Sequence, residues 1–121
     1  MKNIIMDTCF ILTCLEFKID IDQELNNILE EQYSLFYIDK TIEELKKKPL
    51  EKLAISILNK IGAKPIKTTE DTNVDSLLIA HAEANPKDIF ATQDKKLKEK
   101  LKKRNVRLIT IRQKRYLKIV N

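Results

Sequence analysis

The sequence predicts an α/β protein, a three-layer α/β/α sandwich whose central parallel sheet has about five strands. Two observations lead to this prediction. Short apolar runs closed by turn residues alternate along the chain with longer segments that carry apolar residues at helical spacing. The runs also lack the apolar–polar alternation of a half-exposed strand, which is typical of parallel strands covered on both faces. Strand–helix units of these lengths connect by right-handed crossovers.

The first expected strand is the apolar run Asn3–Met6, which ends abruptly at the carboxylate of Asp7. A run closed in this way indicates a buried strand, so Asp7 is expected at the carboxyl end of a central strand. Cys9–Glu16 is apolar on most sides and predicts a short buried helix. A second helix is expected to begin at Asp20 or Asp22. The apolar residues that mark its buried face are Leu25, Ile28 and Leu29.

The next part of the chain predicts one strand and two helices. Tyr33–Ile38 is rich in aromatic and β-branched residues, which favour strands. Thr41–Leu45 starts a helix that Pro49 stops. An amphipathic helix then follows over residues 50–61, and Gly62 is expected at its C-terminal cap.

Two more strands flank a further helix. Ala63–Lys67 is a short strand, and Pro65 places it at an edge of the sheet because proline cannot donate to the strand ladder. A helix with Val74, Leu77, Leu78 and His81 on one side follows, and it ends at Asn85-Pro86. Ile89–Thr92 is the fourth buried strand.

The C-terminal part of the chain is strongly basic. A lysine-rich helix is expected over 94–103, a fifth strand at Val106–Ile111 and a basic tail at Gln113–Asn121. Residues 95–121 carry 12 Lys or Arg and one acid, whereas residues 1–94 carry 11 Lys and 17 acids, so the net charge of +5 conceals an acidic body and a basic end. This division suits a metal site beside a track for a polyanion, and it also fits a solvated helix face.

Residues 1–121 are expected to form one domain, with the basic strand and tail from about residue 95. No apolar segment approaches the roughly 20 residues that span a membrane, and the N-terminus does not resemble a signal peptide. We therefore expect no membrane partner and a cytoplasmic location. Cys9 and Cys14 lack a zinc-binding spacing and are expected to be reduced core thiols.

Four carboxylates are expected at one edge of the sheet, because the carboxyl ends of parallel strands meet there. They are Asp7, Glu44, Asp75 and Asp94. Each also has a structural alternative. Asp7 and Asp94 are placed to cap the helices that follow them, and Thr41 with Glu44 and Thr72 with Asp75 have the spacing of a capping box. For each acid taken alone, the cap is the more common outcome.

The four acids together favour a metal site. Caps need not recur at one end of a sheet, whereas acids gathered there repel one another unless a cation neutralises them. Their hard oxygen atoms suit Mg²⁺ or Mn²⁺. No nucleophilic triad competes with this hypothesis, since the single histidine, His81, is expected to pack in the core.

These residues resemble the motifs of the PIN-domain nucleases, in the same order and over nearly the whole chain. Ile4–Thr8 is similar to the opening run of that family, and Glu44-Leu45 to its second acidic motif. Asp75 with residues 78–80 resembles the third motif, and residues 91–94 with Leu97 the fourth. The resemblance implies the strand order 3-2-1-4-5. Cys9 replaces an Asn or Ser common in the family, which we expect to alter hydrogen bonding around the site.

The resemblance implies a Mg²⁺- or Mn²⁺-dependent endoribonuclease. Asp7, Asp75 and Asp94 would bind one or two ions, and Glu44 would be a ligand or would orient the attacking water. Thr8 and Thr92 are expected to support these side chains. The candidates for binding RNA phosphates are Lys95, Lys96, Arg112, Lys114 and Arg115.

Within the family, the chain is more similar to the archaeal and eukaryotic group typified by Fcf1 and Utp24, which cleave pre-rRNA. This similarity lies in residues 7–21 and 108–116. Pre-rRNA processing is therefore the expected role, with a structured RNA as partner. A VapC-like toxin restrained by an antitoxin peptide and a non-catalytic RNA-binding module are the alternatives. The apolar residues of the first two helices are compatible with a homodimer.

Overall fold

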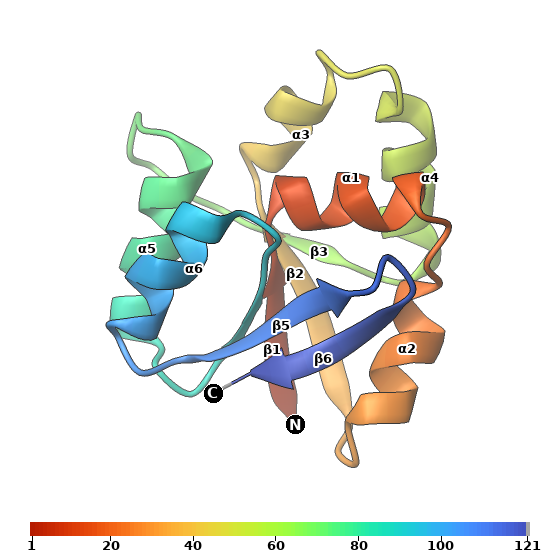
Figure 1. Cartoon of the computed structure of the whole chain (residues 1–121). Coiled ribbons are helices and arrows are strands. Elements are labelled where there is room, and N and C mark those ends of the chain that lie inside the picture. The colour runs from red at the N-terminus through yellow and green to blue at the C-terminus, as the bar shows by residue number, and fades with distance from the viewer. Residues whose placement is uncertain (121) are drawn as a thin grey trace.

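The computed structural model describes residues 1–120, which form a six-stranded sheet covered by helices (Figure 1). The strands are β1 (Lys2–Met6), β2 (Tyr33–Ile38), β3 (Lys64–Ile66), β4 (Ile89–Ala91), β5 (Arg107–Arg112) and β6 (Tyr116–Val120). Their spatial order is β3-β2-β1-β4-β5-β6. Strands β1 to β5 pair in parallel and β6 pairs antiparallel with β5. The predicted order 3-2-1-4-5 is confirmed, and β3 lies at an edge as expected.

The C-terminal tail is the main correction to the predicted fold. The chain turns at Gln113 and Lys114, which both have positive φ angles of 52° and 56°, and returns as β6 beside β5. The connection has three residues, Gln113–Arg115, and no glycine or asparagine, which are the usual residues at positive φ in tight hairpin turns, so the sequence lacked the common signal for the hairpin. Asn121, the last residue of the predicted tail, lies outside the described residues.

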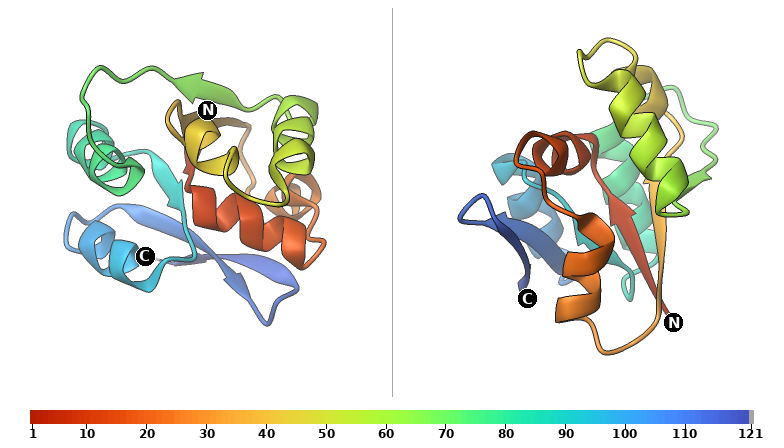
Figure 2. Two further views of the ribbon diagram at one scale, coloured as in Figure 1. Left: turned by 90° about the horizontal axis from the view of Figure 1, so that it is seen from above. Right: turned by 90° about the vertical axis from the view of Figure 1, so that its right-hand side faces the viewer.

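Helices cover both faces of the sheet, which confirms the three-layer arrangement (Figure 1, Figure 2). The helices are α1 (Thr8–Glu16), α2 (Ile21–Ile28), α3 (Thr41–Leu45), α4 (Glu51–Lys60), α5 (Val74–Ala84) and α6 (Lys95–Lys102). Side chains alternate across a strand, so Ile4 and Met6 of β1 pack with buried residues of α1 to α4, whereas Ile5 packs with those of α5 and α6. Each face of β1 therefore has its own core. No helix within residues 1–120 combines the length and apolarity that crossing a bilayer would need.

The register of the central strands sets the position of the site. Ile5 of β1 lies beside Phe90 of β4 on one side and Phe36 of β2 on the other. All three strands run in the same direction, so the segments that follow them emerge at one edge of the sheet. Asp7, at the end of β1, is thereby placed between the ends of β2 and β4.

The buried face of β6 predicts that the C-terminal segment stabilises the fold. Leu117 is 1% exposed and belongs to the same core as α1 and α2. Replacing a buried leucine by alanine typically costs about 2–4 kcal/mol, so Leu117→Ala should lower the free energy of unfolding by that amount in urea denaturation. The matched change Lys118→Ala, at the next and exposed position, should alter it by less than about 0.5 kcal/mol. Equal small effects for both variants would contradict a structural strand.

Candidate active site

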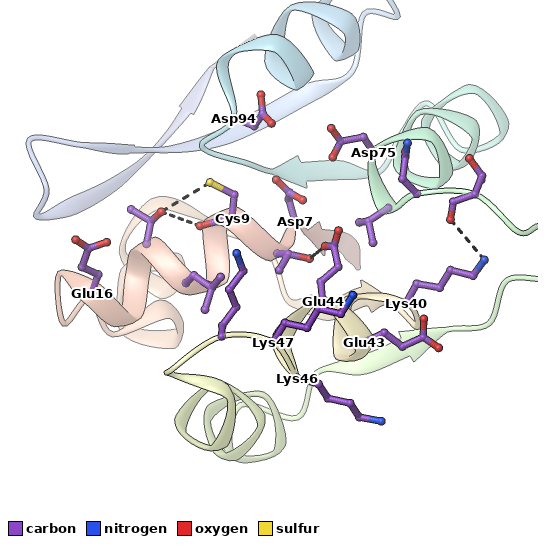
Figure 3. Close-up of a pocket in the computed structure, with 17 residues that line it drawn as sticks. Asp7, Cys9, Glu16, Lys40, Glu43, Glu44, Lys46, Lys47, Asp75 and Asp94 are labelled. Carbon is purple, nitrogen blue, oxygen red and sulfur yellow. Dashed lines mark hydrogen bonds between the residues drawn. The ribbon is translucent and has the colours of Figure 1, made fainter.

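A cleft of about 980 Å³ opens at the carboxyl edge of the sheet, and all four predicted acids line it. Asp7 comes from the end of β1, Glu44 from α3, Asp75 from the first turn of α5 and Asp94 from the start of α6. Figure 3 shows Asp7 in the middle, with Asp94 and Asp75 on one side and Glu44 on the other. Four segments that are distant in sequence thus contribute one carboxylate each to the same cleft.

Asp7 is the most buried of these acids, and it does not cap a helix. It occupies the N-cap position of α1, but its carboxylate accepts no capping hydrogen bond in the part of the chain that the structure describes. Instead, Asp7 Oδ2 accepts a hydrogen bond of 2.9 Å from the hydroxyl of Thr92. The side chain is almost fully enclosed, with the residue 4% exposed. The structural alternative for Asp7, a helix cap, is therefore wrong.

Burial raises the pKa of the Asp7 carboxyl to about 6, because a charge is unfavourable away from water. The hydrogen bond from Thr92 and that from the backbone N–H of Thr8 act in the opposite direction. The charges of Asp75 and Asp94 raise the pKa of Asp7 further. A carboxylate that is buried next to other acids gains from a cation nearby.

Asp94 does cap a helix, as predicted, and it also lines the cleft. Its Oδ1 accepts hydrogen bonds from the backbone N–H groups of Lys96 at 2.9 Å and Leu97 at 3.2 Å. The backbone N–H of Asp94 in turn donates to Oγ1 of Thr92 at 3.1 Å. Thr92 thus accepts from the backbone of Asp94 and donates to the carboxylate of Asp7, so one hydroxyl fixes two of the four acids relative to each other.

Glu44 is positioned by Thr8 rather than by a capping box. Lys40, not Thr41, occupies the N-cap position of α3, and no side chain caps that helix within residues 1–120. The hydroxyl of Thr8 donates to Oε1 of Glu44 at 2.6 Å, and its oxygen lies 3.1 Å from Oγ1 of the buried Thr41. The capping-box alternative for Thr41 and Glu44 is wrong, because the Glu44 side chain accepts from Thr8 and lines the cleft.

Asp75 is likewise free of a capping role. The cap of α5 is Asn73, whose Oδ1 accepts from the backbone N–H of Ser76 at 2.8 Å, so the Thr72–Asp75 capping box is also wrong. Burial and the charges of Asp94 and Glu44 raise the pKa of Asp75. Three of the four acids therefore face the cleft without serving a helix end.

The loop between β3 and α5, which leads to Asp75, is attached to the turn after β2. The backbone N–H and hydroxyl of Thr68 donate to Asp39 at 3.0 and 2.6 Å. The ammonium group of Lys40 donates to the carbonyls of Glu70 and Thr72, and it lies 3.7 Å from the Asp71 carboxylate. These contacts hold the segment before Asn73 and so fix where α5 begins. No pattern in the sequence indicates these contacts.

The oxygen donors of the cleft suit a hard divalent cation. However, no three Asp, Glu, His or Cys side chains among residues 1–120 are close enough together to hold a metal ion as a preformed set. Mg²⁺ commonly keeps several waters and takes one or two carboxylates together with substrate phosphate oxygens, so a shared cleft of carboxylates fits its chemistry. Asp7, Asp75 and Asp94 as a joint ligand set stay a prediction.

The basic residues predicted to bind RNA lie beside the cleft rather than in its lining. Lys95 and Lys96 are exposed at the start of α6, directly after Asp94, and Arg112 ends β5. Lys114 and Arg115 lie at the β5–β6 hairpin, where Lys114 Nζ is 5.6 Å from the ring centre of Phe17. The lysines that do line the cleft are Lys40, Lys46, Lys47 and Lys48. Sequence reasoning missed all four, although the run of three lysines just after Glu44-Leu45 was a usable signal.

The remaining candidates divide between the cleft and other parts of the fold. Both cysteines are free thiols, and Cys14 is buried as expected, but Cys9 is exposed and lines the cleft, so its assignment to the core was wrong. His81 is away from the acids. Its Nε2 lies 2.9 Å from Asp88, and its ring packs edge-on against Phe90 at 5.9 Å between ring centres.

The fold and the arrangement of acids define a class of proteins, and comparison with known sequences identifies it. The sequence profile of the family described as "PIN like domain" matches residues 4–114. The chain therefore belongs to the PIN-like domain family, which confirms the resemblance seen in its motifs.

Two relatives are similar over almost the whole chain. Ribonuclease VapC4 of Methanocaldococcus jannaschii is 32% identical over 127 residues, covering 98% of this chain and 97% of the relative. The solved structure of the PIN domain endonuclease Utp24 superposes with a TM-score of 0.86, covering 97% of this chain and 90% of that one, at 23% identity. At this level of identity, the second similarity establishes the fold.

Because Asp7 is buried, we predict that its ionisation lowers the free energy of unfolding of the metal-free protein as the pH rises. Its pKa is raised from 3.8 to about 6, so the folded state binds the proton more tightly. The stabilisation that comes from protonated Asp7 is fully present below pH 3.8 and is lost as the pH rises through about 6. Asp7→Asn keeps an oxygen that can accept from Thr92 but carries no charge. In EDTA at pH 7.5 it should therefore unfold with a free energy on the order of 2 kcal/mol higher than wild type, with little difference at pH 4.

Urea denaturation of both proteins at the two pH values measures this difference. Glu31→Gln, which removes an exposed carboxylate, is the control and should follow the wild-type protein. A constant difference between Asp7→Asn and wild type at the two pH values would contradict the perturbed pKa of Asp7.

Proposed function

We propose that the protein is a Mg²⁺- or Mn²⁺-dependent endoribonuclease that hydrolyses phosphodiester bonds at the acidic cleft. The observation that carries this proposal is the convergence of Asp7, Glu44, Asp75 and Asp94 on one cleft, with Asp7 buried and not used as a cap. A buried carboxylate next to other acids lowers stability unless a cation neutralises it, and ionisable groups perturbed in this way are concentrated at functional sites.

The similarity to VapC4 supports RNA as the substrate. That relative is named a ribonuclease, and the similarity covers 98% of this chain, so it includes all four acids' segments. Membership of the PIN-like domain family supports nuclease chemistry. The basic residues of α6 and the β5–β6 hairpin lie beside the cleft, where they would bind the phosphates of a polyanion without reading its bases.

The residues around the cleft would divide the work of hydrolysis. Asp7, Asp75 and Asp94 would hold the divalent cation, which when bound supplies Lewis-acid activation of water and of the phosphoryl group. Thr92 keeps the Asp7 carboxylate oriented by its 2.9 Å hydrogen bond. Asp94 uses Oδ1 for its helix, which leaves Oδ2 for the cleft. Glu44, held at Oε1 by Thr8, would orient the attacking water through Oε2 and accept its proton.

The arrangement of the caps argues against a non-catalytic RNA-binding module. That alternative assumes that the four acids of the cleft serve only to cap the N-termini of helices. Of the four, only Asp94 caps a helix, and the caps of α2 and α5 are Asp20 and Asn73, which do not belong to the acidic set. Capping therefore does not explain Asp7, Glu44 or Asp75.

We propose pre-rRNA processing in the cytoplasm as the biological role, on the basis of the motifs around residues 7–21 and 108–116. A toxin ribonuclease restrained by an antitoxin peptide is the second candidate. The observation in its favour is the full-length similarity to VapC4 at 32% identity.

Removal of single carboxylates tests the enzymatic proposal. Asp7→Asn and Asp94→Asn should each reduce cleavage of a structured RNA in Mg²⁺ or Mn²⁺ by at least about 100-fold, because a metal ligand is lost. Glu99→Gln, an exposed acid on α6, should cleave like wild type. Thermal unfolding with and without Mn²⁺ provides a second readout: the metal should raise the Tm of wild type but not of Asp7→Asn. Full activity of a folded Asp7→Asn protein would rule out the proposed site.

Expression in a bacterial host distinguishes the two biological roles. If the protein is a toxin, production of the wild type should arrest growth. Production of Asp94→Asn, which lacks one of the four carboxylates of the cleft, should not. Sequencing of the cleaved RNA ends then separates the candidates directly. Cuts confined to small-subunit rRNA precursors support rRNA processing, whereas cuts in tRNA or mRNA together with growth arrest support the toxin role.

A further inference from the structure

We propose that the turn between α3 and α4 is a second RNA-binding surface, in which Lys47 and Lys48 bind phosphate groups on the opposite side of the cleft from α6. This inference rests on the proposed ribonuclease function and extends it from the cleavage site to the path of the substrate. RNA would then be held on both sides of the bond that is cut, rather than only by the basic C-terminal part of the chain.

The position of the turn supports this assignment. Lys47 and Lys48 line the same cleft as the four acids, whereas none of the basic residues predicted from the sequence to bind RNA does. Figure 3 shows Asp94 and Lys47 on opposite sides of Asp7. A strand of RNA whose phosphate reaches Asp7 would therefore have one neighbour near α6 and the other near the α3–α4 turn.

The backbone of the turn is held in place, so its lysines project from a fixed base. The N–H of Lys48 donates to the carbonyl of Leu45 at 2.9 Å, and the N–H of Glu51 donates to the carbonyl of Lys48 at 3.2 Å. Leu45 itself is fully buried in the core beneath α3. Ordering this segment on binding RNA would cost little backbone entropy, unlike ordering a flexible basic tail.

The lysines of the turn are also available for a ligand. Lys40, which lines the cleft as well, is occupied by the β3–α5 loop through Glu70, Thr72 and Asp71. Across residues 1–120, the ion pairs are Lys40 with Asp71, His81 with Asp88 and Arg104 with Glu83, and none involves Lys47 or Lys48. Unpaired ammonium groups at the rim of a cleft that accepts a phosphodiester are suited to the flanking phosphates.

Lys46 provides a matched control within the same run. It also borders the cleft, but its side chain extends away from the four acids (Figure 3). Removing its charge together with that of Lys52, an exposed residue of α4 that does not line the cleft, changes the net charge of the protein as much as removing Lys47 and Lys48. A difference between the two double variants therefore reports position rather than total charge.

The test is the salt dependence of RNA binding by the full chain. Binding of a fluorescein-labelled stem-loop RNA with single-stranded arms is followed by fluorescence anisotropy in EDTA, where metal-dependent cleavage is prevented. Each phosphate contact contributes about 0.7 to the slope of log K against log salt for a single strand, so Lys47→Gln/Lys48→Gln should lower the slope by about 1.4 and weaken binding roughly tenfold. Lys46→Gln/Lys52→Gln should retain the wild-type slope, and Lys47→Arg/Lys48→Arg should restore it in a folded protein.

Trimmed substrates test whether the two basic surfaces lie on opposite sides of the cut. Once the wild-type cut is mapped, the RNA is shortened on one side of it at a time. The effect of Lys47→Gln/Lys48→Gln should disappear when one side is trimmed, and that of Lys95→Gln/Lys96→Gln when the other is trimmed. Loss of both effects on trimming the same side would overturn the two-sided arrangement.

Failure of this inference can be distinguished from failure of the proposed function. If wild type cleaves RNA and Lys47→Gln/Lys48→Gln binds it with the wild-type slope and affinity, the second surface is wrong and the nuclease remains. If the Lys47 and Lys48 variant shows the expected loss but Asp7→Asn cleaves like wild type, RNA binding by the turn stands and the acidic site does not. If wild type neither binds nor cleaves the RNA, both are overturned.

Discussion

The hydrogen bond from Thr92 to the buried carboxylate of Asp7 is the interaction on which the rest of the site depends. It joins the ends of β1 and β4, the two central strands, at the edge where their order along the chain reverses. This hydrogen bond and that from the backbone N–H of Thr8 do not offset the cost of enclosing a charge, and the pKa of Asp7 rises to about 6 as a result. β1 is packed on both faces, which holds the carboxylate at this buried position.

The other acids are placed by contacts that leave their carboxylates facing the cleft. The buried hydroxyl of Thr8 holds Glu44, and that of Thr92 holds Asp7. Asn73 takes over the capping of α5, which releases Asp75. The negative charges lie in one cleft without forming a closed set of ligands, so the site is open to a cation that keeps its waters and shares them with a phosphate.

The strands and the acids at the edge of the sheet could be predicted because each depends on local pattern, whereas the strand order was implied by the resemblance of the motifs to a known family. Buried parallel strands have continuous apolar runs, and polar residues directly after them must lie at the carboxyl edge. The β5–β6 hairpin was not predictable in this way, since its turn uses Gln113 and Lys114 at positive φ in place of glycine. Capping was also misjudged. Thr41 and Thr72 have the right spacing for a capping box, but the use of a side chain as a cap depends on tertiary contacts, such as that of the Thr41 hydroxyl with Thr8.

The two outer strands of the sheet determine how a second copy of the chain could associate with it. On the β6 side, the backbone N–H of Leu117 is already bound by the Glu24 carboxylate of α2 at 3.1 Å. On the β3 side, Pro65 has no N–H to offer in a strand of only three residues. Both edge strands therefore disfavour pairing with a strand of another chain. Self-association through helical faces would leave the six-stranded sheet unchanged.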